Sequence, residues 1–197
     1  MQANLENDIK LHGLYVSSVG AKGKKLIKDE VNFSKNKLEE IDLSESSLTE
    51  CIFSEAIIKK VDFFRAELYS SYFEKTIIEE TNFTKVKGDF ASFMNSQISN
   101  SDFVKSDFPE SNFSDTIIKA CNFTEIDIRE ADFTNSVIEN VDFKLANIDQ
   151  TILKNVKLIN VKNIDKAMIE SMNIGSIDNP IILESKEAFD WLMKNNK

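Results

Sequence analysis

The sequence predicts an all-β solenoid, a chain that winds into a coil and turns a corner after every five residues. A step of five from Phe33 to Leu158 visits 26 positions, and 25 of them are Phe, Ile or Leu. A small residue stands two places before most of these positions, and Asp or Asn stands directly before many of them. A helix would rotate each step by ~140°, and a flat strand would send successive side chains to opposite faces. A repeat of short fixed period that neither element can bury indicates a solenoid.

Residues 1–30 lie outside the five-residue register and are expected to form an N-terminal cap. The end of an open coil would otherwise expose unpaired strand edges. The segment LHGLYVSSVGAKGKKLI has apolar, strand-like runs around a Gly- and Lys-rich turn, which favours a hairpin-like cap.

Residues 31–163 carry the repeat, which is clearest in VDFFR, TNFTK, SDFVK, CNFTE, ADFTN and VDFKL. On these windows the chain resembles the pentapeptide repeat family, whose motif is a small residue, Asp or Asn, Leu or Phe, and two variable residues. The resemblance implies a right-handed quadrilateral β-helix with twenty residues per coil. The 26 windows then make about 6.5 coils.

A coil of twenty residues stacks each side chain on the one twenty residues away. Ten phenylalanines are therefore predicted to form the core stack, in two opposite columns: Phe53, Phe73, Phe93, Phe113 and Phe133 in one, and Phe63, Phe83, Phe103, Phe123 and Phe143 in the other. Cys51 and Cys121 would lie on opposite faces and ~17 Å apart along the axis, which excludes a disulfide between them.

Gly88 is the one exception to the five-residue pattern, in the column Leu48, Leu68, Gly88, Phe108, Ile128 and Ile148. Either Phe108 or Phe90 is expected to fill the gap that a glycine leaves. The irregularity is open to two interpretations, a tolerated defect or a deliberate kink or contact point.

Residues 164–197 are expected to form a C-terminal cap with a helix around residues 186–195. Its apolar stripe consists of Phe189, Trp191, Leu192 and Met193. A helix folded over the last coil would shield the open end. The family resemblance adds a second role, because in some members a C-terminal helical segment holds a homodimer together.

Two sets of outward residues form the candidate interaction surface. The first is a ladder of Ile57, Ile77, Ile117 and Val137, interrupted by Gln97, and the second is an aromatic group of Phe64, Tyr69 and Tyr72. Such a ladder either stabilises stacked strands or docks a partner, and the aromatic group is either ordinary rod surface or a binding patch.

Composition and motifs argue against catalysis. The chain has a single histidine, His12, and lacks a CxxC pair, a Gly-rich phosphate loop and a Gly-Asp calcium motif. We therefore expect no catalytic residues, no metal and no cofactor. The absence of a secretory signal or a membrane-spanning run predicts a cytoplasmic protein. A net charge of -9 disfavours direct binding of nucleic acid or membrane.

Two functions follow from these observations. Resemblance to the quinolone-resistance members implies an acidic rod that imitates DNA and modulates DNA gyrase, a type II topoisomerase. Residues 31–160 hold 23 acidic and 14 basic residues, but seven of the acids fill the turn position that the repeat demands. The broader hypothesis is a noncatalytic protein-binding scaffold of unknown partner. Acids gathered into two stripes would favour mimicry, and an apolar ladder buried in a dimer would favour the scaffold.

Overall fold

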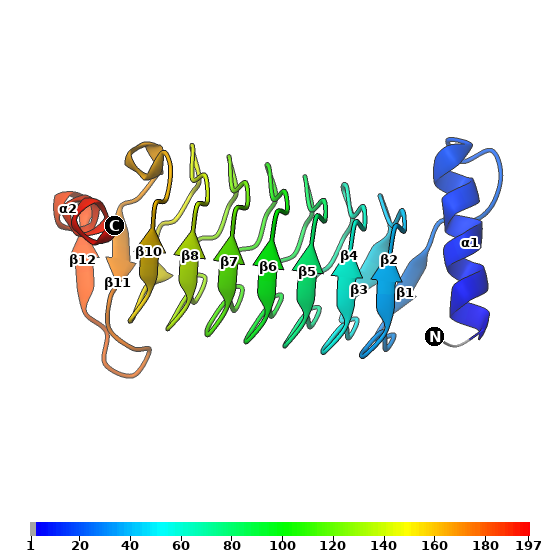
Figure 1. Ribbon diagram of the computed structural model, residues 1–197, viewed down its shortest axis with the longest axis horizontal. Helices are drawn as coiled ribbons and strands as arrows, with labels where there is room; N and C mark the ends of the chain where they lie inside the picture. Colours follow the sequence, from blue (N-terminus) through cyan, green and yellow to red (C-terminus); the bar gives the residue numbers. More distant parts are fainter. Residues whose placement is uncertain (1–2) are drawn as a thin grey trace.

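The computed structural model describes residues 3–197 and is a right-handed quadrilateral β-helix of about seven turns with a helix at each end (Figure 1). The coils stack along the long axis of the molecule, which is a rod, and the two helices lie at its opposite ends. The elements in chain order are α1 (Ala3–Ser17), β1 (Ile27–Asp29), β2 (Lys37–Glu39), β3 (Ser47–Thr49), β4 (Ile57–Lys59), β5 (Ile77–Glu79), β6 (Gln97–Ser99), β7 (Ile117–Lys119), β8 (Val137–Glu139), β9 (Thr151–Ile152), β10 (Lys157–Ile159), a 3-10 turn (Ile164–Lys166), β11 (Ser171–Asn173), β12 (Ile182–Glu184) and α2 (Ser185–Asn195).

One side of the rod is a seven-stranded parallel sheet in the order β10, β8, β7, β6, β5, β4, β2. Its register joins residues twenty apart, as in Ile57 opposite Ile77 and Ile117 opposite Val137. The other sides are joined largely by single parallel bridges with the same offset, such as Asp62 to Asn82. The predicted coil of twenty residues is confirmed.

Each corner depends on one residue in the left-handed conformation. Every fifth residue from Glu30 to Asn160 has a φ between 49° and 62°, and none of these 27 residues is glycine. Their N–H groups donate to the next coil, as Lys35 does to the Ser54 carbonyl at 3.1 Å. The Asp or Asn of the motif accepts the N–H two residues later, as Asp132 does from Thr134 at 2.8 Å. The polar half of the motif therefore builds the corners.

The core consists of two facing columns of phenylalanine, and all ten residues of the predicted core stack are buried. In the first column neighbouring rings are nearly parallel, with centroids 4.6 Å apart between Phe53 and Phe73 and 4.9 Å between Phe113 and Phe133. Rings of opposite columns meet edge to face, at 89° between Phe53 and Phe63. Offset stacks and edge-to-face pairs are the favourable aromatic arrangements.

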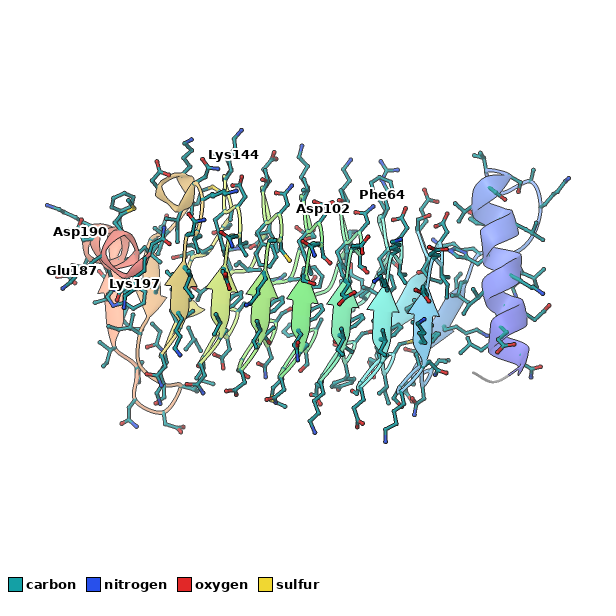
Figure 2. All side chains as sticks on the ribbon, in the orientation of Figure 1. Phe64, Asp102, Lys144, Glu187, Asp190 and Lys197 are labelled. Atoms are coloured by element: carbon teal, nitrogen blue, oxygen red, sulfur yellow. The ribbon has the colours of Figure 1, made fainter. Side chains whose placement is uncertain are left out.

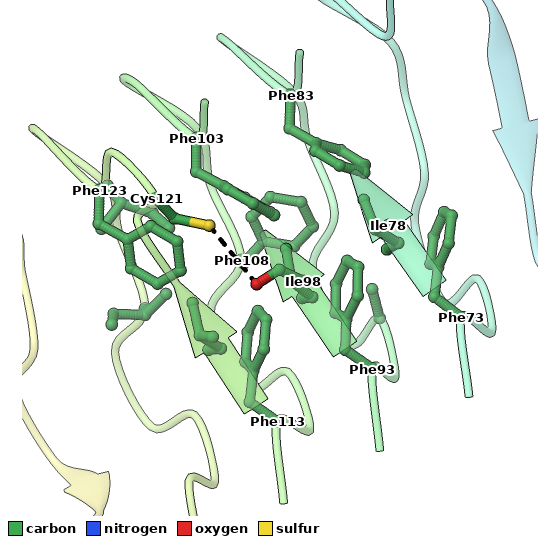
Figure 3. Close-up of a cluster of buried hydrophobic side chains, with 14 of the residues drawn as sticks. Phe73, Ile78, Phe83, Phe93, Ile98, Phe103, Phe108, Phe113, Cys121 and Phe123 are labelled. Atoms are coloured by element: carbon green, nitrogen blue, oxygen red, sulfur yellow. Dashed lines mark hydrogen bonds between the residues drawn. The ribbon is translucent and has the colours of Figure 1, made fainter. Parts of the chain in front are cut away.

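Phe108 fills the space at Gly88 and changes the second column around it. A Cβ atom at Gly88 would lie 2.2 Å from Cε1 of Phe108, so the ring occupies the place of the missing side chain. Figure 3 shows this ring among the phenylalanines of both columns. The angle between neighbouring rings in the second column is 13° for Phe83 and Phe103 but 61° for Phe103 and Phe123. Phe90, the other predicted plug, is 56% exposed and is not part of the core.

The N-terminal segment forms a helix, so the predicted hairpin-like cap is wrong. Helix α1 lies beside the first coil, with Leu5 and His12 buried and Ile9 packed against the core. These three residues are four and three positions apart and so share one helical face. The sequence did not show this stripe as an apolar helical face, because its third member, His12, is polar. The Nδ1 atom of His12 accepts the N–H of Leu26 at 3.0 Å and so fixes the chain at its entry to the coil.

Helix α2 packs its buried residues, Ala188 and Leu192, against the last coil. Leu192 lines a hollow of about 20 Å³ together with Phe143 and Leu158. Ahead of the helix, β12 pairs antiparallel with β11 and forms the edge of a three-stranded sheet. Helix α2 and the β11–β12 pair therefore cover the core at the C-terminal end of the rod.

Candidate functional site

The reactive groups of the interior include two buried cysteine thiols. Burial raises the pKa of Cys51 to about 11 and that of Cys121 to about 12, and both are free thiols. Among residues 3–197, no group of three or more His, Cys, Asp or Glu side chains is placed to hold a metal ion. Neither helix of this described part is long and apolar enough to cross a membrane. The predicted interaction residues lie on the outer surface of the rod.

The surface consists of columns of residues twenty apart, and charge is distributed unevenly among them. The low-charge side comprises the four outer columns that contain Tyr72, Glu74, Lys75 and Ile77. Between residues 29 and 160 these columns hold 4 acidic and 5 basic residues, a net of 5 - 4 = +1. The other eight outer columns form the acidic side, which holds 21 acidic and 9 basic residues, a net of 9 - 21 = -12. The rod is therefore electrostatically two-sided.

The acidic side is divided into two acidic stripes by a basic corner. The first stripe consists of the columns of Glu67, Asp89 and Glu110, with 10 acids and 2 bases; the second consists of the columns of Glu79, Glu80 and Asp102, with 9 acids and 3 bases. Between them, the columns of Phe64 and Arg65 hold 4 bases and 2 acids. Phe64 and Lys144 of this corner project from one edge of the rod in Figure 2.

Several lysines on the acidic side are already paired. Lys59 lies 3.1 Å from Glu79, Lys119 lies 2.9 Å from Glu139, and both partners are one coil away. In the first stripe Arg129 binds Asp127 at 2.7 Å. Burial, followed by repulsion from Asp127 and Asp89, raises the pKa of Asp107. At Asp107, burial and the neighbouring acids therefore outweigh Lys87 and Arg129, which act in the opposite direction.

The low-charge side carries the predicted ladder on the seven-stranded sheet. Ile57, Ile77 and Ile117 are 42%, 40% and 39% exposed, and Val137 is half-buried. Gln97 interrupts the ladder, and around it lies a shallow depression of about 290 Å³ between Ile77 and Ile117, lined also by Glu79 and Lys119 of the second acidic stripe. The four predicted ladder residues therefore share one face.

The predicted aromatic group is split by the structure. Phe64 lies at the basic corner, with the Arg65 guanidinium 5.0 Å and the Lys85 ammonium 5.8 Å from its ring centroid. Tyr69 is five residues later, at the next corner, because five residues make one side of the coil. The expectation of a single group is wrong for Phe64.

Tyr69 and Tyr72 have a different companion, Phe90. This residue occupies the left-handed corner position in the coil after Tyr69 and is 56% exposed, while Tyr72 is 44% exposed. The five-residue register could have located Phe90, because it lies two places after position 88 and must face outward. Its closeness to Gly88 in the sequence instead suggested that Phe90 could fill the gap in the core.

The C-terminal helix divides its apolar residues between two environments. Leu192 is buried and Trp191 is half-buried against the core, whereas Phe189 and Met193 are exposed. Exposed Ile177, Ile181 and Ile182 lie in the preceding loop and strand. This end of the rod therefore retains an apolar surface after the helix has covered the core.

The geometry agrees with a comparison to known families. The model of pentapeptide repeats matches residues 29–65, 91–129 and 126–162, which together span more than half of the chain. The chain belongs to the pentapeptide repeat family. Searching curated proteins gives no match.

Solved structures of pentapeptide repeat proteins resemble this rod. HetL of the cyanobacterium Nostoc sp. strain PCC 7120, involved in regulating heterocyst differentiation, is 18% identical, with a TM-score of 0.42, over 77% of this chain and 80% of its own. QnrB1, a plasmid-mediated fluoroquinolone resistance protein, is 17% identical, with a TM-score of 0.45, over 74% of this chain and 89% of its own. These similarities concern the fold alone.

Proposed function

We propose that this pentapeptide repeat protein is a noncatalytic protein-binding scaffold. The observation that carries the proposal is the low-charge side, where the apolar ladder forms one outer column of a parallel sheet. The other outer column of the same strands, that of Glu79, belongs to the second acidic stripe and borders the ladder on one flank only. Interfaces differ from other protein surfaces chiefly in having fewer charged residues at their centre. The depression at Gln97 supplies a place for one protruding side chain of a partner.

The low-charge side supplies about half the area of a typical interface. From β2 to β10 the sheet has six steps of ~4.8 Å, or roughly 29 Å, and one side of ~10 Å with half of the adjoining sheet side gives roughly 430 Å². A typical specific complex buries about 800 Å² on each partner. Rigid backbone pairing also holds the ladder side chains in a fixed row, which lowers the entropic cost of binding.

The partner is a protein, and a second copy of this chain is one form that it can take. The exposed Phe189 and Met193 of α2 support a homodimer at the C-terminal end, and the ladder supports one along the sheet. A cytoplasmic location remains our prediction and accords with the buried, free Cys51 and Cys121.

Site-specific photocrosslinking in cells tests the scaffold. A benzoylphenylalanine placed at Ile77 is expected to give discrete covalent adducts, and the same group at Lys105 in the basic corner serves as the matched control. The change Ile57→Lys with Ile117→Lys should remove the adducts from position 77. Adducts of twice the chain mass identify a homodimer. Equal adduct patterns at positions 77 and 105 would contradict the proposal.

A second candidate is a DNA-mimicking modulator of DNA gyrase, and the two acidic stripes favour it. Their columns carry 19 acids against 5 bases along the rod. The basic corner between the stripes disfavours DNA mimicry, because no row of positive charges separates the two phosphate backbones of DNA.

A gyrase supercoiling assay with and without a quinolone tests this candidate. Mimicry predicts inhibition or drug protection at micromolar protein. Glu110→Gln with Glu130→Gln, which removes two exposed charges from the first stripe, should weaken the effect. Glu55→Gln with Asp115→Asn removes two charges from the low-charge side and should not. No effect of the unmodified protein across this range would exclude gyrase modulation.

A further inference from the structure

Three aromatic residues lie where the first acidic stripe meets the low-charge side. Tyr69 and Phe90 belong to one corner, and Tyr72 begins the next side of the coil. Phe90 is the one aromatic residue among the left-handed corner positions from Glu30 to Asn160. Above and below Phe90 in its column stand Glu110 and Ser70.

Carboxylates surround this aromatic group. Glu50 and Glu110 share the column of Phe90, Asp89 follows Tyr69 in its column, and Glu67 begins the same corner. Lys87 is the only base in the columns of Glu67, Asp89 and Glu110 before Arg129. The group is therefore apolar at its centre and negative at its rim.

The titration of nearby groups agrees with this arrangement. Burial raises the pKa of Tyr69, and the acids Asp89, Glu67 and Asp107 add to the shift, against Lys87. The pKa of Asp107 is raised by burial and by Asp127 and Asp89. Burial is the largest cause of both shifts; Asp89 adds to each of them, and Lys87 opposes each of them.

We propose that Tyr69, Tyr72 and Phe90, with the carboxylates around them, form a docking patch for a lysine- or arginine-rich segment of a partner protein. This inference rests on the proposed scaffold function and names the chemistry of one partner. Cationic side chains suit both parts of the patch, because their charged heads pair with carboxylates while their heads or stems lie against aromatic rings. A neutral apolar segment would leave the rim carboxylates without a partner, and an acidic one would be repelled.

Phe64 supplies an internal contrast. It is also an aromatic corner residue, but Arg65 and Lys85 already lie against its ring. Phe64 therefore shows that corner aromatics of this rod accept cations, while its own site is occupied by cations of the same chain. Phe90 and the two tyrosines have acids in place of those bases.

The test measures binding of a fluorescent nonalysine peptide by anisotropy at low salt, with a nonaglutamate peptide as the charge control. Nonalysine should bind and nonaglutamate should not. Phe90→Asn and Tyr69→Ser should each weaken nonalysine about threefold, and the double variant about tenfold. Phe64→Ser is the matched control and should leave the affinity within about 1.5-fold of the unmodified protein.

Loss of affinity must come from the patch and not from unfolding. Asparagine accepts the left-handed conformation of position 90 more readily than phenylalanine, so the Phe90→Asn protein should melt at or above the temperature of the unmodified one. Nonalysine binding that is unchanged in the double variant, or weakened equally by Phe64→Ser, would overturn the docking patch. Either result leaves the crosslinks from position 77 unaffected, so the scaffold proposal fails or succeeds separately.

Discussion

Replacing Gly88 by alanine tests the packing around Phe108. The added Cβ atom would lie 2.2, 2.5 and 3.0 Å from three ring carbons of Phe108, far inside ordinary contact distance. The ring cannot simply retreat, since its centroid is 5.6 Å from that of Phe93 and 5.7 Å from that of Phe103. Overpacking of a filled core typically costs 1–3 kcal/mol, and we expect about 3 kcal/mol here. For a chain of this size that loss lowers the Tm by roughly 6–12 °C.

A second substitution should restore the stability. Phe108→Leu alone is expected to cost about 1–2 kcal/mol, because a smaller side chain leaves the space beside Gly88 empty. Gly88→Ala combined with Phe108→Leu returns the column to the aliphatic pattern of its neighbours Leu68 and Ile128. The double variant should lie within about 1 kcal/mol of the unmodified protein, which gives a coupling of at least about 3 kcal/mol between the two sites.

Urea unfolding followed by far-ultraviolet circular dichroism measures all four proteins of this cycle. Gly13→Ala is the matched control, because a Cβ atom at Gly13 has nothing within 4 Å and the position lies within helix α1. It should stabilise the protein by about 0.5–1 kcal/mol. Additive effects of the Gly88 and Phe108 substitutions, within about 0.5 kcal/mol, would refute the assignment of Phe108 as the group that fills the gap.

Four further predictions follow from individual residues. Phe90→Asn should raise the free energy of unfolding by about 0.5–1 kcal/mol in the same urea assay, because a bulky exposed residue there has a φ of 62°. Leu192→Ala should cost about 2–5 kcal/mol, because it enlarges the hollow between α2 and the last coil, and proteolysis should then remove the C-terminal segment first. Burial lowers the pKa of His12 below its ordinary value of 6.5, so below pH 6.5 the unfolded chain binds a proton at His12 more readily than the folded protein does. The free energy of unfolding should therefore keep its full His12 contribution above pH 6.5 and decrease as the pH falls below it. The thiols of Cys51 and Cys121, with pKa values of about 11 and about 12, should not react with a disulfide reagent at pH 8 until the chain is denatured.

Each of these predictions has its own control. For Phe90, the exposed corner residue Asn95 already has the preferred type, so Asn95→Phe should destabilise by a similar amount. Phe189→Ala on the exposed side of α2 should cost much less than Leu192→Ala. His12→Gln should remove the loss of stability below pH 6.5. Burial acts to raise the pKa of Asp149, but the backbone N–H groups of Ser171 and Glu170 together with side-chain hydrogen bonds lower it below its ordinary value of 3.8, so its contribution is lost only at lower pH. Rapid labelling of both thiols in the native protein would contradict their burial.

Much of the rod followed from local repetition. A large apolar residue every five positions predicts a coil that turns a corner at that interval, with the motif Asp and Asn at the corners. The family resemblance supplied the turn of twenty residues, and the two phenylalanine columns followed from it. Gly88 and Phe108 were also paired correctly, because stacking at twenty residues makes them neighbours. Helix α2 was predictable from its own apolar stripe, with Leu192 among the residues expected to face the core.

Tertiary structure decided the features that depend on how separate columns lie around the rod. Helix α1 was missed because its buried stripe includes His12, whose burial depends on the hydrogen bond to Leu26 rather than on apolarity. Phe64 and Tyr69 are close in sequence but lie at different corners, while Tyr69 and Phe90 are 21 residues apart and share one. The division into an acidic side and a low-charge side was also hidden in the net charge of -9. The net charge does not say where the charged residues lie, whereas the coil places each of them in a column and so divides the surface into an acidic side and a low-charge side.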